Sequence, residues 1–258
     1  FVCALGLFPP LLQSQTKSLA PESVYALKQV QSPRLSPEGN WILYGVSQAD
    51  STKDNYLSRL YMVSRDGKET LCLTEQTQNP SSWQWSPDGK YISFMASSKK
   101  EEVKGRQLFL MDRRGGEPVQ LTSVKGDILD YDWSPDGRKL VLTITDPSMA
   151  DTAKTKIRKP YEIDRFHFKQ DYAGYLDNRK THLYLFSLAD KKLDTLTRGN
   201  FNETDPSFDP SGNRIVYVSN TTADPDRNSN SDIFILDLAR QNAVRQITQF
   251  RGSDSRPQ

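Results

Sequence analysis

The chain has 258 residues, of which 36% are hydrophobic, and its 34 basic residues nearly balance 32 acidic ones, for a net charge of +2. This length is enough for a sizeable core or for part of a larger repeat fold. So small a charge gives no electrostatic reason to propose nucleic acid as a partner, and no basic stripe alternates with aromatic residues. Helix-period patterns are scarce, and short runs of Tyr, Phe, Ile, Leu and Val favour an all-β chain.

The chain begins with an apolar, uncharged stretch at residues 1–12, followed by a polar stretch at 13–17. The apolar part is too short to span a bilayer, and it resembles the apolar region of a secretory signal without its Met and basic start. We expect residues 1–15 to be a signal-peptide remnant of an exported protein, periplasmic or secreted. The alternative is a buried strand, which Pro9 and Pro10 disfavour. Cleavage would remove Cys3 and leave Cys72 without a disulfide partner.

The segment from 16 to 32 is expected to form an N-terminal helix and linker before the first repeat. No later segment is apolar enough to be a membrane helix, so we expect no membrane association after signal cleavage.

One turn phrase occurs four times in the chain. It reads LSPEG at 35–39, WSPDG at 85–89 and at 133–137, and FDPSG at 208–212. Proline presets φ for the second position of a tight turn, Asp or Ser suits the third, and Gly tolerates the positive φ at the exit. The preceding Ser or Asp can cap the turn with its side-chain oxygen.

Each turn leads into apolar residues at strand spacing, then into a second apolar run, and the unit closes on Leu-Thr or Ile-Thr. Thirteen residues separate Thr74 from Pro87, Thr122 from Pro135, and Thr197 from Pro210. A unit of about 40–50 residues with four short strands is typical of a propeller blade. We therefore expect blades at 33–74, 82–122, 130–197 and 205–248, with a partial β-propeller over 33–258. The alternative is a β-sandwich with coincidental turns, which the constant spacing disfavours although sandwiches also show turn signals at regular intervals.

The same spacing places the next turn proline at position 261, beyond Gln258. Residues 249–258 therefore predict the start of a fifth blade, and the ring is expected to be incomplete in this chain, because closed propellers have four to eight blades.

Three further features bear on a catalytic or metal site. Ser47 lies in GVSQA, which resembles a nucleophile elbow without its last Gly, but it occupies the same repeat position as Ser97 and indicates an ordinary strand end. The loop at 224–232 has alternating oxygen ligands, yet it lacks the Gly and Glu of a calcium loop. Two separated histidines and one cysteine are too few for a zinc site, so no metal or cofactor is expected.

The third unit carries about 25 extra residues, which we assign to an insertion at about 146–181 between its second and third strands. It contains a basic run at 154–159, and alternation over 163–169 predicts an extra strand or hairpin. Long loops on rigid scaffolds often bind something. Candidate residues facing a substrate or another domain are Arg165, His167, Asp171 and Tyr175. The alternative is a structural flap whose aromatic residues pack on the blade.

The repeats that end in Leu-Thr and continue into an aromatic-S-P-D-G turn resemble the propellers of TolB and of the prolyl oligopeptidase family. PYEIDRFHFKQD at 160–171, RKTHLYLF at 179–186 and LAPESVYAL at 19–27 are similar to the acylaminoacyl-peptidase and dipeptidyl-peptidase branch. The resemblance covers about residues 19–258.

This resemblance implies an exported or cytosolic serine peptidase that cleaves short peptides, in which the propeller filters substrates for a C-terminal α/β-hydrolase domain. None of the catalytic motifs occurs here, so no catalytic residue is assigned. The alternative is a TolB-like periplasmic propeller that binds proteins without catalysis. A lactonase-like propeller would need metal ligands along a central channel, and two histidines make it weak.

Overall fold

The computed structural model describes residues 20–75, 79–98, 103, 105–147, 162–171 and 174–257. Within these residues the chain forms four four-stranded antiparallel sheets, each running in order from its first to its last strand, and one two-stranded hairpin. The all-β prediction is confirmed. The signal-peptide prediction for residues 1–15 lies outside the described residues, so it stays a prediction.

Sheet 1 contains β1 (Lys28–Leu35), β2 (Trp41–Asp50), β3 (Asn55–Ser64) and β4 (Thr70–Cys72); sheet 2 contains β5 (Ser81–Trp85), β6 (Tyr91–Ser97), β7 (Arg106–Asp112) and β8 (Val119–Gln120). Sheet 3 contains β9 (Ile128–Trp133), β10 (Lys139–Thr145), β13 (Thr181–Ser187) and β14 (Leu193–Thr195); sheet 4 contains β15 (Glu203–Phe208), β16 (Arg214–Ser219), β17 (Asp232–Asp237) and β18 (Ala243–Gln246). The hairpin pairs β11 (Lys169–Gln170) with β12 (Gly174–Tyr175).

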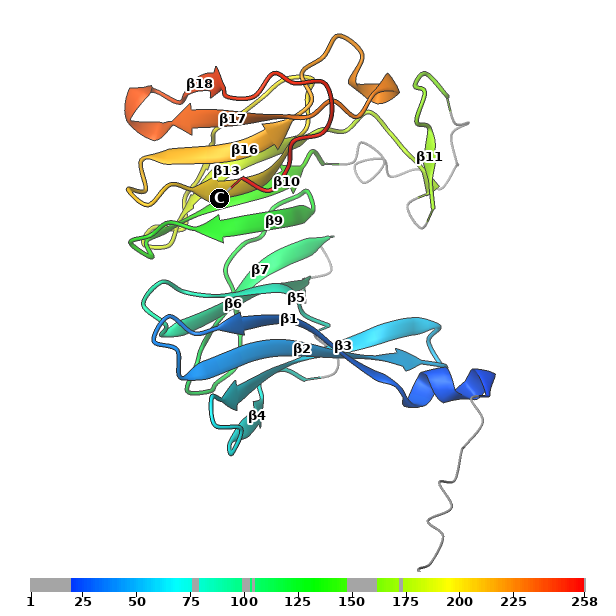
Figure 1. The fold of residues 1–258 in the computed structure, drawn as a ribbon, viewed down its shortest axis with the longest axis vertical. Helices are drawn as coiled ribbons and strands as arrows, with labels where there is room; N and C mark the ends of the chain where they lie inside the picture. Colours follow the sequence, from blue (N-terminus) through cyan, green and yellow to red (C-terminus); the bar gives the residue numbers. More distant parts are fainter. Residues whose placement is uncertain are drawn as a thin grey trace, which may run out of the picture.

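The sheets stack face to face in chain order, with sheet 1 at one end and sheet 4 at the other (Figure 1). A short 3-10 helix, η1 (Pro21–Ala26), precedes sheet 1. Strand β1 begins at Lys28, inside the stretch that the sequence pattern gives to the linker. The first sheet therefore starts five residues before the expected boundary at residue 33, because β1 pairs with β2 from Lys28 onward.

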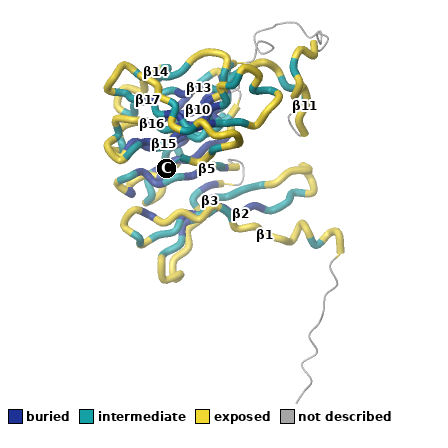
Figure 2. The backbone as a smooth tube through the Cα atoms, turned by 45° about the horizontal axis from the view of Figure 1, so that its top comes forward, coloured by how far each residue is buried: buried dark blue, intermediate teal, exposed yellow. Residues whose placement is uncertain are grey.

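Burial follows the stacking of the sheets. Strands β6 and β10, in the two inner sheets, bury five consecutive residues each, whereas β2 and β17, in the two end sheets, bury alternate residues. Consecutive burial is the pattern of a strand covered on both faces. Three apolar clusters fill the spaces between successive sheets, and buried segments lie inside the stack in Figure 2.

The four turn phrases fold as the sequence predicts. In the second turn Ser86 Oγ donates to Asp88 Oδ1 at 2.7 Å and accepts from the Tyr91 amide at 2.9 Å. Gly89 N–H donates to Ser86 O, with φ at +68°. A Cβ on Gly89 would lie 3.5 Å from Cδ of Pro37, and Gly137 and Gly212 lie in the same way against Pro87 and Pro135. Each of the last three turns therefore packs on the proline of the turn before it.

The threonines of the Leu-Thr and Ile-Thr pairs that close the four units bind to the third strand of their own sheet. The fourth strand of each sheet ends before the Leu-Thr or Ile-Thr pair, and the threonine hydroxyl accepts an amide hydrogen from the third strand. The donors and acceptors are Leu60 and Thr74, Leu108 and Thr122, Leu183 and Thr197, and Ile233 and Thr248, at 2.8–3.0 Å. The amide before the threonine donates back to the carbonyl of the same third-strand residue. We call this pair of contacts the threonine clip.

The GVSQA motif has a packing explanation. A Cβ on Gly45 would lie 2.1 Å from the indole of Trp83, so only glycine admits this ring between sheets 1 and 2. Ser47 is 4% exposed within β2. It therefore occupies an ordinary strand position and not a nucleophile elbow. No helix among the described residues is long and apolar enough to cross a membrane.

The threonine clip predicts a contrast between two buried threonines. In Thr122→Val, the Leu108 amide and the Gln107 side chain lose their partner at Thr122 Oγ1, and we expect unfolding to become easier by about 1–3 kcal/mol. Thr143 is also buried, but its hydroxyl has no hydrogen-bond partner among the described residues. Thr143→Val should therefore leave stability unchanged or raise it. Urea unfolding of both variants tests this, and equal losses would contradict the clip.

Candidate functional site

The candidate site is the insertion between β10 and β13, which lies beside the stack at the end where the second and third strands are joined (Figure 1). Its described parts are residues 146–147, 162–171 and 174–180. The basic run at 154–159 lies outside the described residues. The expected hairpin is present as β11–β12, but residues 163–168 are not a strand, because their polar groups contact a neighbouring loop.

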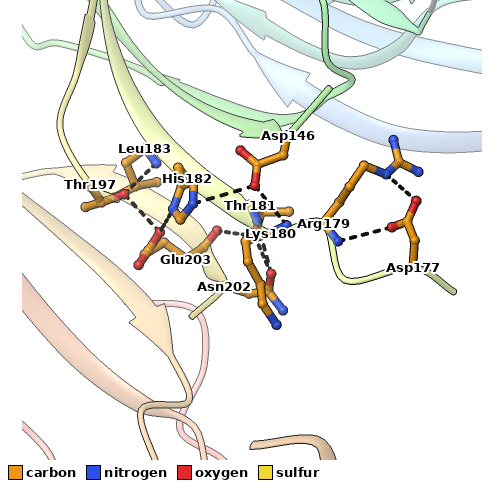
Figure 3. Close-up of polar contacts among 10 residues, drawn as sticks. All are labelled: Asp146, Asp177, Arg179, Lys180, Thr181, His182, Leu183, Thr197, Asn202 and Glu203. Atoms are coloured by element: carbon orange, nitrogen blue, oxygen red, sulfur yellow. Dashed lines mark hydrogen bonds and ion pairs between the residues drawn. The ribbon is translucent and has the colours of Figure 1, made fainter. Parts of the chain in front are cut away.

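The base of the insertion is closed by a pair of hydrogen bonds. The Asp146 amide donates to Lys180 O at 2.8 Å, and the Lys180 amide donates to Asp146 Oδ2 at 3.2 Å. Thr181 then bridges to sheet 4, because its amide donates to Asn202 Oδ1 and its hydroxyl donates to the Glu203 carbonyl. The insertion therefore leaves and re-enters sheet 3 at fixed points (Figure 3).

A buried polar cluster lies next to this base. His182 Nδ1 and Glu203 Oε2 are 2.8 Å apart, and Thr197 Oγ1 donates to the same carboxylate oxygen at 2.9 Å (Figure 3). Burial raises the pKa of Glu203, although the hydrogen bonds from His182 and Thr197 act in the opposite direction. The cluster joins the start of β13 to the start of β15 across two sheets.

The repeat assigns His182 a structural role. In sheets 2 and 4 the same position, one residue before the clipped amide, holds the buried Gln107 and Asp232, and each contacts the hydroxyl of its own clip threonine. His182 reaches its clip threonine through Glu203. His182 therefore occupies a strand position that is polar and buried in sheets 2, 3 and 4.

Arg165 and His167 converge on one carboxylate. Arg165 Nη2 donates to Asp226 Oδ1 at 2.6 Å, and the His167 amide donates to Asp226 Oδ2 at 2.8 Å. Arg165 Nη1 also donates to the Asp177 carbonyl at 2.5 Å. Asp226 lies in a 3-10 helix, η3 (Pro225–Arg227), of the β16–β17 loop. We call these contacts the Asp226 latch, because they hold the insertion of sheet 3 to sheet 4.

The latch is electrostatically favourable. Partial burial disfavours the charged carboxylate, but the hydrogen bonds from Arg165 and from the His167 amide, together with the arginine charge, outweigh it and hold the pKa of Asp226 below its usual value. Both side chains of the ion pair are 22% exposed, so solvent screens them less than a surface pair. Asp226 was not predicted from the sequence, because its loop resembles only an incomplete calcium loop.

The hairpin carries exposed aromatic residues. Phe168 and Tyr175 stack with ring centroids 6.5 Å apart, and the Arg227 guanidinium lies 4.9 Å from the Phe166 ring centre. Phe166, Phe168 and Tyr175 are nevertheless 59%, 41% and 48% exposed. Asp171 lies on the exposed turn side of β11. The four predicted residues thus divide into two latch residues, Arg165 and His167, and two hairpin residues.

The described residues contain no group of three His, Cys, Asp or Glu side chains placed to hold a metal ion. The described part of the insertion presents a latched base and a hairpin with exposed aromatic side chains.

Comparison with known proteins places the stacked sheets in a family context. Residues 94–254 match the family model described as the acylaminoacyl-peptidase N-terminal β-propeller domain. The chain is 27% identical over 225 residues to the uncharacterized peptidase YuxL of Bacillus subtilis, covering 85% of this chain and 34% of that protein. It is 25% identical over 270 residues to dipeptidyl-peptidase 5 of Porphyromonas endodontalis, covering 96% and 38%.

Solved structures show the same fold. The acylaminoacyl peptidase of Pyrococcus horikoshii matches with a TM-score of 0.65 at 16% identity, covering 88% of this chain and 33% of that one. A TolB protein of Agrobacterium tumefaciens matches with a TM-score of 0.53 at 17% identity, covering 87% and 82%. The chain spans about a third of the length of the curated relatives that it matches.

The Asp226 latch predicts a local effect of Asp226→Asn. Hydrogen bonds to charged groups contribute about 1.5–3 kcal/mol, so we expect the Leu176 amide, which closes the hairpin by donating to Phe168 O, to exchange at least about tenfold faster. Hydrogen exchange read at Leu176 measures this. Asp224→Asn is the matched control, because Asp224 pairs with Arg227 in the same loop with a side chain that is 56% exposed. Equal protection in both variants would rule out the latch.

The lowered pKa of Asp226 also predicts a pH dependence. Because this carboxyl has a lower pKa in the folded protein than the usual value of about 3.9, its stabilisation is complete above that value and is lost as the pH falls through the lowered pKa. Corrected for intrinsic exchange, protection at Leu176 should stay constant from about pH 8 to pH 5. A loss of protection between about pH 7 and pH 6 would contradict control of the hairpin by the Asp226 carboxylate.

Proposed function

Because the chain belongs to the family of acylaminoacyl-peptidase N-terminal β-propeller domains, we propose that it is the non-catalytic propeller segment of an exported serine peptidase that cleaves short peptides. The observation that carries the proposal is the family match over 94–254, which begins within β6 of sheet 2 and spans the insertion between β10 and β13 and all of sheets 3 and 4. The similarity to YuxL and to dipeptidyl-peptidase 5 supports a peptidase as the whole protein.

In this proposal catalysis belongs to a C-terminal α/β-hydrolase domain of the same polypeptide. A serine nucleophile activated by histidine would cleave the peptide by acyl transfer. The propeller segment would act on access, because a stack of rigid sheets beside a catalytic domain admits a short peptide more readily than a folded protein. It carries no group proposed for the chemistry, and Ser47 is buried in β2.

The same proposal completes the ring with further sheets. The outer face of sheet 1 carries the stacked pair Tyr44 and Tyr61, and the outer face of sheet 4 carries Val216 and Ile235; all four are only partly buried. Both faces combine apolar side chains with charged ones, such as Arg59 on sheet 1 and Arg245 on sheet 4, and we infer that each is covered by a further four-stranded sheet. Export, to a periplasm or to the outside of the cell, is supported by the apolar start at residues 1–12.

The proposal predicts that the full-length protein hydrolyses short chromogenic peptides and reacts with a fluorophosphonate probe at a single serine outside this chain. Arg165→Ala should reduce peptide turnover through the latch, His167→Ala should reduce it less because its amide makes the main contact, and Ser47→Ala should leave turnover unchanged. Turnover and labelling of the four proteins measure this.

Two results would count against this function. A full-length protein with no labelled serine and no peptide turnover would favour the binding-module alternative. Equal turnover in all three variants would remove the insertion from the functional account while leaving the peptidase in place.

A further inference from the structure

The described hairpin is too small to be stable alone. Its two strands have two residues each, and an isolated two-stranded hairpin is marginal in water even when it is longer. The Asp226 latch fixes the base of the hairpin, but the faces of Phe166, Phe168 and Tyr175 remain 41–59% exposed. Ile163, beside the latch, is 57% exposed. An exposed aromatic group on a latched support is typical of an interaction surface.

The position of this surface follows from strand parity. Each sheet has four antiparallel strands, so the chain enters and leaves every sheet at the same end. The β2–β3 and β16–β17 loops lie at that end. Lys28, at the start of β1, pairs with Gln48 near the end of β2, and Gln246, at the end of β18, pairs with Phe234 near the start of β17. The insertion joins β10 to β13 at this end as well.

Both described ends of the chain show the same arrangement. The Tyr25 carbonyl in η1 accepts from Gln48 Nε2 at 2.8 Å, so the segment before β1 lies at this end. The Asp254 amide donates to Ser231 O at 2.8 Å, so the segment after β18 passes the start of β17. In Figure 1, η1 and β11 lie on the same side of the stack.

A domain linked in sequence to sheets built in this way is tethered at the end that carries the hairpin. Tethering gives such a domain a high effective concentration at this end. Its effective concentration is much lower at the opposite end, which carries the four proline-glycine turns and is called the turn end below. We propose that the aromatic hairpin surface, made of Ile163, Phe166, Phe168 and Tyr175, docks the covalently linked peptidase domain of the same polypeptide. Asp226 positions this surface through the latch. The inference rests on the proposed function, because it needs a second domain.

This inference assigns separate roles to the four candidate residues of the insertion. Arg165 and His167 are positioning residues, because both contacts end on Asp226 within the chain. Tyr175, stacked on Phe168, contributes to the docking surface itself. Asp171 lies next to that surface on the exposed turn side of the hairpin, where it can accept hydrogen bonds from a partner.

The test is site-specific photocrosslinking in the full-length protein, with Tyr175 replaced by p-benzoylphenylalanine. Val119→p-benzoylphenylalanine is the matched control, because Val119 is a similarly exposed apolar residue, at 59%, but begins β8 at the turn end. We expect the Tyr175 probe, and not the Val119 probe, to give an intramolecular crosslink to the C-terminal part of the polypeptide. Adding Asp226→Asn should reduce its yield several-fold.

Other outcomes overturn the inference. A crosslink from Tyr175 only to a second copy of the chain would assign the surface to self-association, and no crosslink, or equal yields from both positions, would show that it docks nothing. Peptide turnover by the unmodified full-length protein is measured in parallel. An active protein without the crosslink refutes the docking surface alone, whereas a crosslink in an inactive protein refutes the peptidase function and keeps the interface.

Discussion

Burial of both faces of each sheet is the constraint on which the rest of this structure depends. Inner strands such as β6 and β10 bury five consecutive residues, which requires cover on both faces, and here neighbouring sheets supply it. The turns align neighbouring sheets with one another, because the glycine of one turn lies against the proline of the turn before it. Because the sheets are aligned and each has four antiparallel strands, the loops between second and third strands all lie at one end of the stack. The insertion is one of these loops.

Much of this fold could be predicted from the sequence because its signals are local. The proline and glycine of each turn set their own backbone angles, and apolar residues at a spacing of two identify the strands. The threonine clip was visible only as a repeated Leu-Thr, since its meaning depends on a third-strand amide such as Leu108, fourteen positions away. The start of β1 was missed because Lys28–Leu35 is mostly exposed and lacks an apolar pattern.

The site was predicted less completely. The sequence indicated Arg165 and His167 through length and alternation, but their partner Asp226 lies in another repeat, about 60 positions on. Nothing in the spacing of either loop indicates that the two meet, since the contact follows from the packing of sheet 3 on sheet 4. In the structure Arg165 and His167 hold the insertion in place through Asp226, and the aromatic residues beside them are exposed.

The central claim is that these sheets are consecutive blades, and that in the full-length protein further blades cover the outer faces of sheets 1 and 4. An experimental structure of the full-length protein tests it most directly. The account predicts a fifth four-stranded sheet against Val216 and Ile235 of sheet 4, with the glycine of its turn on Pro210. A structure in which that face is open to solvent, or covered by a helix or by another protein, would contradict it.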